Sequence, residues 1–148
     1  MTVILKFGGS VITDKANPGV IRSGVIAELA AAVAAANKPA VIVHGAGSLG
    51  HPEAKAYGIA DGVSKENARG VYVTHTAVSR LNAEVVAALR EAGVEAVSFH
   101  PFSSALAENG RLVFCGEEQI SCLLAAGIIP VLHGDVVLDR TRGGCIVS

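Results

Sequence analysis

The stretch Val3-Ile4-Leu5-Lys6-Phe7-Gly8-Gly9-Ser10 opens the chain with a short apolar run that ends in two glycines. An apolar run of this length bounded by a Gly-Gly pair predicts a buried β-strand followed by a tight turn. The pattern recurs at Ala40–His44 and Ile128–Leu132, each followed closely by a glycine. These runs are apolar throughout rather than alternating, which is typical of parallel strands covered on both faces.

Helical segments separate these strands. Ile21–Ala36 is rich in alanine and predicts a helix that ends before Asn37-Lys38-Pro39. A longer helix is predicted over Arg69–Ala92, where apolar residues recur every three or four positions, at Val78, Leu81, Val85 and Leu89. Shorter elements are a helix at Glu117–Ala126, strands at Ala96–Phe99 and Leu112–Phe114, and a hairpin beginning at Val136–Leu138. Strands alternating with helices predict an α/β domain with a mainly parallel sheet.

The chain has 148 residues, of which 51% are apolar and 17% charged, and its formal net charge is −1. A chain of this size buries one hydrophobic core, so we expect residues 1–148 to form a single domain. The nearly balanced charge argues against nucleic acid or an anionic membrane as the main partner. No apolar run reaches the roughly 18 residues that a membrane span needs. An odd number of cysteines without metal-ligand spacing indicates reduced thiols and a cytoplasmic location.

The loop after the first strand combines two glycines with two lysines. Gly8 and Gly9 allow backbone N–H groups to turn toward an anion, and parallel α/β sheets bind ligands beyond the carboxyl ends of their strands. Lys6 at the strand end and Lys15 in the following loop would suit a chain of phosphates. The alternative is an ordinary tight turn with two solvated lysines.

The loop after the second strand reads Gly45-Ala46-Gly47-Ser48-Leu49-Gly50-His51. It matches the G-x-G-x-x-G pattern of dinucleotide-binding loops, with Glu66 near the offset at which an acidic ribose ligand is expected. It is not a nucleotide-binding P-loop, because His51 stands where a lysine is required. The loop could cradle an anion, with the His51 imidazole donating a hydrogen bond. Alternatively, His51 caps the short helix that follows.

A third strand end, His133-Gly134-Asp135, carries an acidic residue that could orient a lysine or a hydrated metal. We favour the simpler interpretation, in which Asp135 forms the turn of a hairpin. His75, His100 and His133 show no metal-ligand spacing and are expected to pack in the core or lie on the surface, and no metal site is predicted. Cys122 is expected to be a small buried apolar residue of its helix.

Taken together, these segments resemble the amino acid kinase superfamily, and within it the isopentenyl phosphate kinases. Ile4–Ser10 with Ile12-Thr13-Asp14-Lys15 is similar to the family's opening, Val43–Pro52 to its second glycine loop, and Pro130–Val137 to its later strand and turn. The loop that ends in Gly50-His51 is more specific to this subgroup than the opening segment, and fosfomycin-phosphorylating kinases share it. The resemblance implies a three-layer αβα sandwich and ATP-dependent phosphorylation of isopentenyl phosphate to isopentenyl diphosphate with Mg²⁺.

The resemblance also implies a role for each site residue. Contacts to the ATP phosphates would come from Lys6, Gly8, Gly9, Ser10 and Gly47. Contacts to the phosphate of the substrate would come from Gly45, Ala46, Gly47 and His51, and Lys15 would stabilise the transition state. A slot for the prenyl tail is expected near Tyr57, Tyr72, Val73, Thr76 and Val78. A homodimer is expected.

Family members continue beyond Ser148, so we expect a shortened chain that holds the acceptor-binding part and is weak or inactive as a kinase. Two other functions remain open besides the fosfomycin-type kinase. One is a non-catalytic domain that binds a phosphorylated ligand. The other is an oxidoreductase that uses the G-x-G-x-x-G loop for a dinucleotide, a hypothesis that gives the first glycine loop and its lysines no task.

Overall fold

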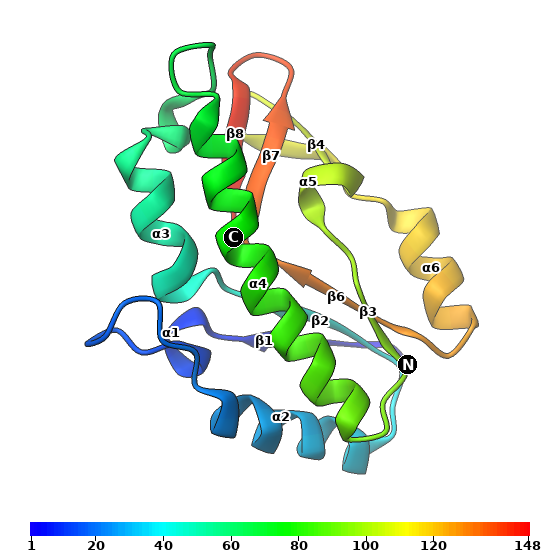
Figure 1. The fold of residues 1–148 in the computed structure, drawn as a ribbon. Helices are drawn as coiled ribbons and strands as arrows, with labels where there is room; N and C mark the ends of the chain where they lie inside the picture. The colour runs from blue at the N-terminus through cyan, green and yellow to red at the C-terminus, as the bar shows by residue number, and fades with distance from the viewer.

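The computed structural model describes residues 1–148 as two four-stranded sheets with helices packed around them (Figure 1). The first sheet is entirely parallel and has the order β1-β2-β6-β3. Its strands are β1 (Val3–Phe7), β2 (Ala40–His44), β6 (Ile129–His133) and β3 (Ala96–Ser98). The predicted α/β class with a parallel sheet is confirmed, and each predicted strand of this sheet lies within one residue of its expected bounds.

The second sheet contains the strand predicted at Leu112–Phe114 and the hairpin predicted from Val136–Leu138, but the sequence pattern did not indicate that they form a sheet of their own. It has the order β5-β4-β7-β8, from β5 (Arg111–Phe114), β4 (Leu106–Glu108), β7 (Asp135–Asp139) and β8 (Gly143–Val147). Two antiparallel hairpins, β4–β5 and β7–β8, meet through a parallel contact between β4 and β7. Only Gly134 separates β6 from β7, so the chain passes from one sheet to the other at this residue.

Four helices of nine or more residues surround the sheets: α2 (Ser23–Ala36), α3 (Gly47–Ala56), α4 (Arg69–Glu91) and α6 (Glu117–Ala125). Short helical turns complete the fold at α1 (Gly9–Ile12), η1 (Ile59–Asp61) and α5 (Pro101–Ser104). The helix expected from Ile21 begins two residues later, at Ser23, and ends where predicted because Asn37 adopts a left-handed conformation, φ 43°, and its N–H bonds the last turn.

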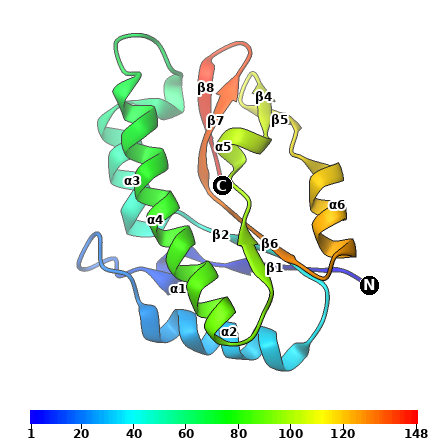
Figure 2. The same cartoon turned by 45° about the vertical axis from the view of Figure 1, so that its right-hand side comes forward.

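The long helix α4 supplies much of the core and packs against both sheets (Figure 2). Its four residues predicted to face inward, Val78, Leu81, Val85 and Leu89, are completely buried. Three of them join α2 and the first sheet in a cluster of 14 buried residues. Burial of such side chains, worth about 1.5–3 kcal/mol each, holds α2 and α4 against one face of the parallel sheet.

The two faces of the parallel sheet are not covered equally. All five residues of β6 are buried, as expected for a strand covered on both sides. At the sheet edge, in contrast, β1 alternates, and Ile4 is 74% exposed. The prediction that every strand is covered on both faces is therefore wrong for β1, whose second face meets no helix. Cys122, expected to be buried, is exposed on α6.

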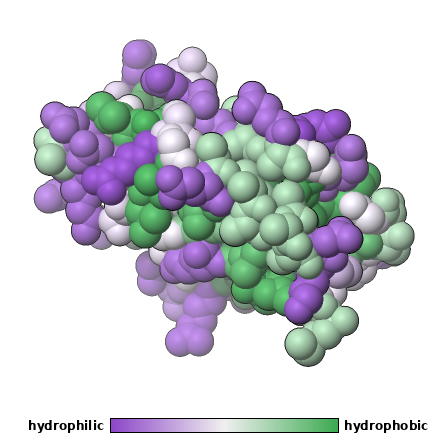
Figure 3. Space-filling model, turned by 90° about the horizontal axis from the view of Figure 1, so that it is seen from below, coloured by the Kyte–Doolittle hydropathy of each residue, from purple (hydrophilic) through white to green (hydrophobic).

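The underside of the molecule, where α2 lies, presents a broad apolar surface between hydrophilic regions (Figure 3). Alanines on the exposed side of α2, among them Ala31 and Ala32, contribute to it. None of the helices combines the length and the apolar character that crossing a membrane requires.

Asp139 anchors the turn of the β7–β8 hairpin. Its carboxylate accepts hydrogen bonds from the backbone N–H groups of Asn109, Gly110, Thr141 and Arg142, at 2.7–3.2 Å. Burial alone would raise the pKa of Asp139, but these backbone donors outweigh it and lower the pKa to about 2. One ionised side chain thus joins the two hairpins of the second sheet.

Close packing of α3 on α4 gives the first testable prediction. A Cβ at Gly50 would lie 2.3 Å from Val78 Cγ1 and 2.9 Å from Ala46 Cβ, so Gly50→Ala must push the helices apart. We expect a loss of about 1–3 kcal/mol in the free energy of unfolding, measured in urea. Gly24→Ala is the control, because nothing lies within 4 Å of a Cβ there. It should be neutral or stabilising by up to about 1 kcal/mol; equal losses in both variants would contradict the packing argument.

Candidate active site

The two glycine loops follow neighbouring parallel strands and start side by side. The register pairs Lys6 with Val43 and Phe7 with His44, so both strands end at the same edge of the sheet. The Gly45 N–H donates to the Phe7 carbonyl oxygen at 3.1 Å and extends this pairing into the loops.

Beyond this edge the backbones of the two loops touch. A Cβ built on Gly9 would lie 2.5 Å from the Gly47 nitrogen, and one on Gly45 would lie 2.8 Å from the Gly9 nitrogen. Real Cβ atoms do not come this close to backbone atoms, and Gly47 also has a positive φ of 57°. Glycine is therefore required where the loops meet.

The Thr13 hydroxyl clasps the two loops together. Its Oγ1 donates to the Gly9 carbonyl oxygen at 2.7 Å and accepts from the Ser48 N–H at 3.0 Å. Thr13 is completely buried, so both bonds are made away from water. Thr13 follows the first loop in the sequence, but no role could be predicted for it. A local pattern does not reveal its contact with Ser48, which lies 35 residues further along the chain.

The loops enclose a cavity of about 590 Å³. All nine residues predicted for the site line it: Lys6, Gly8, Gly9, Ser10, Lys15, Gly45, Ala46, Gly47 and His51. The other lining residues are Thr13, Pro18, Ser48, Pro52 and Ser148, so the side chains of the wall include two ammonium groups and an imidazole but no Asp or Glu. An anion is the ligand that such a wall favours.

His51 and Lys15 reach this cavity from exposed positions. His51 lies within α3 rather than at its N-cap, which is Ala46, so the capping interpretation is wrong. Lys15 follows Asp14, whose carboxylate accepts from the Ala16 N–H at 2.8 Å and from Asn17 Nδ2 at 3.0 Å. The Asn17 bond, followed by that of Ala16, lowers the pKa of Asp14. The ionised turn holds the segment that carries Lys15.

A magnesium ion held by the protein does not fit this cavity. Mg²⁺ is bound in proteins through carboxylates and substrate phosphates, and retains several waters. The lining offers hydroxyl oxygens but no Asp or Glu, and no group of three or more His, Cys, Asp or Glu could hold a metal. Any Mg²⁺ here would have to be held by phosphates rather than by these residues.

Four histidines lie close together behind the loops; His44 and His133 are buried, and His75 and His100 are partly exposed. His44 and His133 end the adjacent strands β2 and β6 in register, and their rings stack with centroids 5.4 Å apart. His100 Nδ1 lies 2.8 Å from His133 Nε2, and His75 Nδ1 lies 2.8 Å from Asp135 Oδ2. His133 packs in the core, in line with the expectation for these histidines, but the contacts among them were not predicted, because the fold joins residues that are far apart in sequence.

The expectation that Asp135 forms the turn of a hairpin is wrong. Asp135 is the first residue of β7 and is 2% exposed, whereas the hairpin turn lies between Asp139 and Gly143. Burial raises the pKa of Asp135 to about 6, opposed by the hydrogen bond from His75. Asp135 thus links β7 to α4 from inside the protein.

A narrow apolar slot of about 20 Å³ adjoins His51. Its walls come from α3, α4 and β8 and consist mainly of Gly50, Ala54, Thr74, Val78, Ile146 and Val147. Of the five residues expected near a tail slot, only Val78 lines it. Tyr72 is 70% exposed, and Tyr57 instead packs against Gly70.

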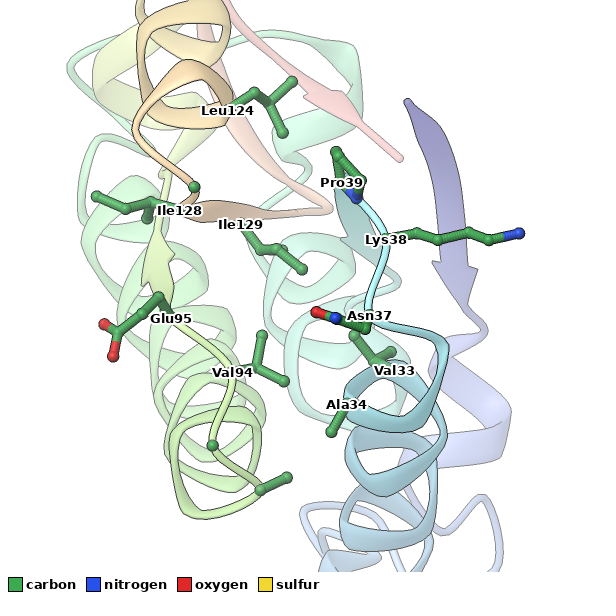
Figure 4. A pocket seen from close by; sticks show the side chains of 13 residues that line it. Val33, Ala34, Asn37, Lys38, Pro39, Val94, Glu95, Leu124, Ile128 and Ile129 are labelled. Carbon is green, nitrogen blue, oxygen red and sulfur yellow. The ribbon is translucent and has the colours of Figure 1, made fainter. Parts of the chain in front are cut away.

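A second large cavity, of about 520 Å³, lies at the opposite edge of the parallel sheet, where the strands begin. Val33, Val94 and Ile129 point into it, whereas the charged ends of Lys38 and Glu95 point away (Figure 4). It therefore presents no cluster of charged groups to a ligand, in contrast with the cavity between the glycine loops.

The structure does not place an acidic residue where a dinucleotide-binding loop needs one to bind the ribose. Glu66 is exposed in a turn, where it bonds Ser64, rather than at the end of a strand beside the loop. A model of the Amino acid kinase family, in contrast, matches residues 1–148.

The chain belongs to the amino acid kinase family.

Two curated relatives with high sequence identity to this chain are isopentenyl phosphate kinases. Over 148 aligned residues, the chain is 40% identical to an isopentenyl phosphate kinase of Haloferax volcanii and covers 60% of that protein. It is 38% identical to an isopentenyl phosphate kinase of Methanothermobacter thermautotrophicus and covers 55% of it. These alignments include 99% and 95% of this chain. The chain thus spans less than two thirds of the length of these relatives.

Solved structures of the family agree with this comparison. X-ray structures of isopentenyl phosphate kinase match with a TM-score of 0.92 and 36% identity, covering all of this chain and 63% of that one. A product complex of the Thermoplasma acidophilum isopentenyl phosphate kinase matches with a TM-score of 0.88 and 28% identity, covering 100% and 61%. An aspartate kinase from Synechocystis, with 18% identity and a TM-score of 0.62, shares the fold alone.

The Thr13 clasp gives a testable prediction for the amino acid kinase fold of this chain. Thr13→Val keeps the shape of the side chain but loses the hydrogen bonds to Gly9 and Ser48, so the Ser48 N–H is left without its partner. We expect a loss of about 1–3 kcal/mol in unfolding free energy and weaker binding of inorganic pyrophosphate. Thr13→Ser retains the hydroxyl and should bind pyrophosphate nearly as well as the wild type. Unchanged binding by Thr13→Val, measured by calorimetry, would contradict the clasp.

The buried histidines predict lower stability in acid. Burial lowers the pKa of His44 to about 4 and of His133 to about 3, so below pH 6.5 the unfolded chain takes up protons that the folded chain does not. Asp135 acts oppositely, because its raised pKa of about 6 lets the folded chain keep a proton between pH 6 and its usual 3.8. Between about pH 6 and pH 4 the unfolded chain therefore binds one proton more than the folded chain. The free energy of unfolding falls by about 1.4 kcal/mol for each pH unit of acidification.

Urea unfolding at pH 7, 6, 5 and 4.5 checks this expectation. Unfolding free energy should change little from these groups above pH 6.5 and should fall steadily from pH 6 toward pH 4. A stability that is constant or rises on acidification over this range would contradict neutral burial of the two histidines.

Proposed function

We propose that the enzyme to which these residues belong transfers a phosphoryl group from ATP to isopentenyl phosphate and forms isopentenyl diphosphate. One observation carries the proposal: two glycine loops, two lysines and His51 surround a single cavity whose lining contains no Asp or Glu side chain. The similarity to isopentenyl phosphate kinases over nearly the whole chain supports the choice of acceptor.

The chemistry suits these groups. Phosphoryl transfer needs little covalent help from the protein; it needs alignment of donor and acceptor and neutralisation of charge on the transferred group. Here both reactants are anions and repel each other. Fixed N–H groups and lysines offset that repulsion without reorganising during the reaction. No general base is needed, because an acceptor phosphate oxygen is already deprotonated at neutral pH.

In this proposal the two loops divide the work. Lys6, Gly8, Gly9, Ser10 and Gly47 contact the phosphates of the donor. Gly45, Ala46, Gly47 and His51 hold the acceptor phosphate, and Lys15 stabilises charge on the group in transfer. Because the lining holds no Asp or Glu side chain, any Mg²⁺ would be held by the nucleotide phosphates, where it would add positive charge.

The apolar slot beside His51 suits the tail of such an acceptor. Gly50, Ala54, Val78, Ile146 and Val147 give it an apolar wall, while His51 and Asp135 also line the slot. With the acceptor phosphate on His51, a short tail would extend toward this slot, between α3 and α4. We therefore infer that residues 1–148 form the acceptor side of the enzyme as one domain.

Substitution of His51 tests the proposal. His51→Ala removes a hydrogen-bond donor to a charged phosphate, which is worth about 1.5–3 kcal/mol, so isopentenyl phosphate should bind roughly 10- to 100-fold more weakly. Calorimetry on the purified chain measures this affinity, with His51→Gln as the variant that keeps a donor. Isopentenol, which lacks the phosphate, should not bind.

Three outcomes decide among the alternatives. Unchanged affinity in His51→Ala rejects the role of His51. Tighter binding of fosfomycin than of isopentenyl phosphate favours the phosphonate kinase. Binding of isopentenyl phosphate with no diphosphate formed from Mg-ATP, followed by phosphorus NMR, favours a domain that only binds.

A further inference from the structure

The buried histidine His44 contacts the second glycine loop from behind. Its Nδ1 lies 3.0 Å from the Gly45 carbonyl oxygen, and its Nε2 lies 3.1 Å from Asn82 Nδ2. His44 is 1% exposed and Asn82 is completely buried. Neither residue lines the anion cavity, so any effect on a ligand acts through the loop.

These two partners fix which ring nitrogen carries the proton. A carbonyl oxygen only accepts, so Nδ1 must carry the hydrogen and donate to Gly45. The Asn82 amide then donates to Nε2, and the same Nδ2 group also donates to the Val131 carbonyl oxygen at 3.2 Å. Burial keeps the ring neutral by lowering its pKa to about 4. The ring is thus held as the Nδ1–H tautomer.

The bond to Gly45 sets the orientation of the next amide. A trans peptide is planar, with its C=O and N–H pointing in opposite directions. Because the Gly45 carbonyl points back to His44, the Ala46 N–H points away from the ring. This N–H has no backbone hydrogen-bond partner, although Ala46 is only 9% exposed and lines the cavity. Buried N–H groups without partners are rare, which marks this one as reserved for a ligand.

We propose that His44 is a positioning residue that, held by Asn82, aims the Ala46 N–H at the phosphate of the ligand. The proposal rests on the proposed function, because it needs an anion in the cavity. It adds a claim that the proposed function does not contain. The affinity of the second glycine loop for an anion depends on the proton at Nδ1 of His44, although His44 does not contact the anion.

The neighbouring strand provides a matched comparison. His133 is 2% exposed, and its Nδ1 lies 3.0 Å from the Gly134 carbonyl oxygen, as in His44-Gly45. The peptide after Gly134, however, leads into β7, where Asp135 pairs with Val147. The same substitution at the two histidines therefore removes the same local bond, but only at His44 does the next N–H face the cavity.

Proton-detected nitrogen NMR on the purified 148-residue chain tests the tautomer directly. The ring signals of His44 should show hydrogen on Nδ1 and none on Nε2 at pH 7. Hydrogen on Nε2 would overturn the proposal. In the same sample, the Ala46 amide signal should shift on titration with inorganic phosphate.

Phosphate affinity in variants then tests the consequence. His44→Leu should bind phosphate at least tenfold more weakly and lose the Ala46 shift, whereas His133→Leu should stay within about threefold of the wild type. Equal weakening in both variants would show a merely structural role and overturn the proposal, as would unchanged binding in His44→Leu. A wild type that binds no phosphate would instead reject the proposed function, while the tautomer result still stands.

A second pair of variants decides the matter if the leucine variants do not fold. Asparagine places its N–H donor where His44 carries Nδ1, and glutamine places it nearer to Nε2. His44→Asn should recover phosphate binding to within about threefold of the wild type, and His44→Gln should not. The reverse order would contradict the proposal.

Discussion

The backbone contact between Gly9 and Gly47 brings two strand ends together into one site. Neither loop alone could surround an anion, because each supplies N–H groups from one side only. Their separation is set by three local features: the absence of a Cβ at Gly9 and Gly45, and the Thr13 hydroxyl that bonds both loops. The parallel register of β1 and β2 makes this approach available, because it ends the two strands at one edge.

The basic side chains of the site lie near water. Lys6, Lys15 and His51 are exposed, whereas His44 and His133 behind the loops are buried, and burial lowers their pKa so that they stay neutral. A charged imidazole at His44 would incur a large desolvation cost, and a neutral one orients a peptide at little cost. The site thus combines exposed basic side chains in front with two buried, neutral imidazoles behind.

Much of this arrangement could be predicted because it is written in local patterns. Apolar runs that end in glycines located β1, β2 and β6, and the spacing of Val78, Leu81, Val85 and Leu89 located α4. The loop sequences and the family resemblance together indicated nine candidate site residues, and all nine line one cavity. The parts that could not be predicted depend on contacts between distant residues. Thr13 meets Ser48, His75 meets Asp135, and His100 meets His133 only after folding. The hairpin from Val136 was predicted, but its place in a separate second sheet was not, because β6 continues into β7 past a single glycine and the sequence shows no break between the sheets.

A crystal structure of the chain with bound pyrophosphate would show whether both loops hold the same anion. One anion should accept hydrogen bonds from N–H groups of both loops, at Gly8–Ser10 and at Ala46–Gly47, and should contact His51 and at least one of the two lysines. An anion held by only one loop, or bound outside the cavity between them, would contradict this prediction.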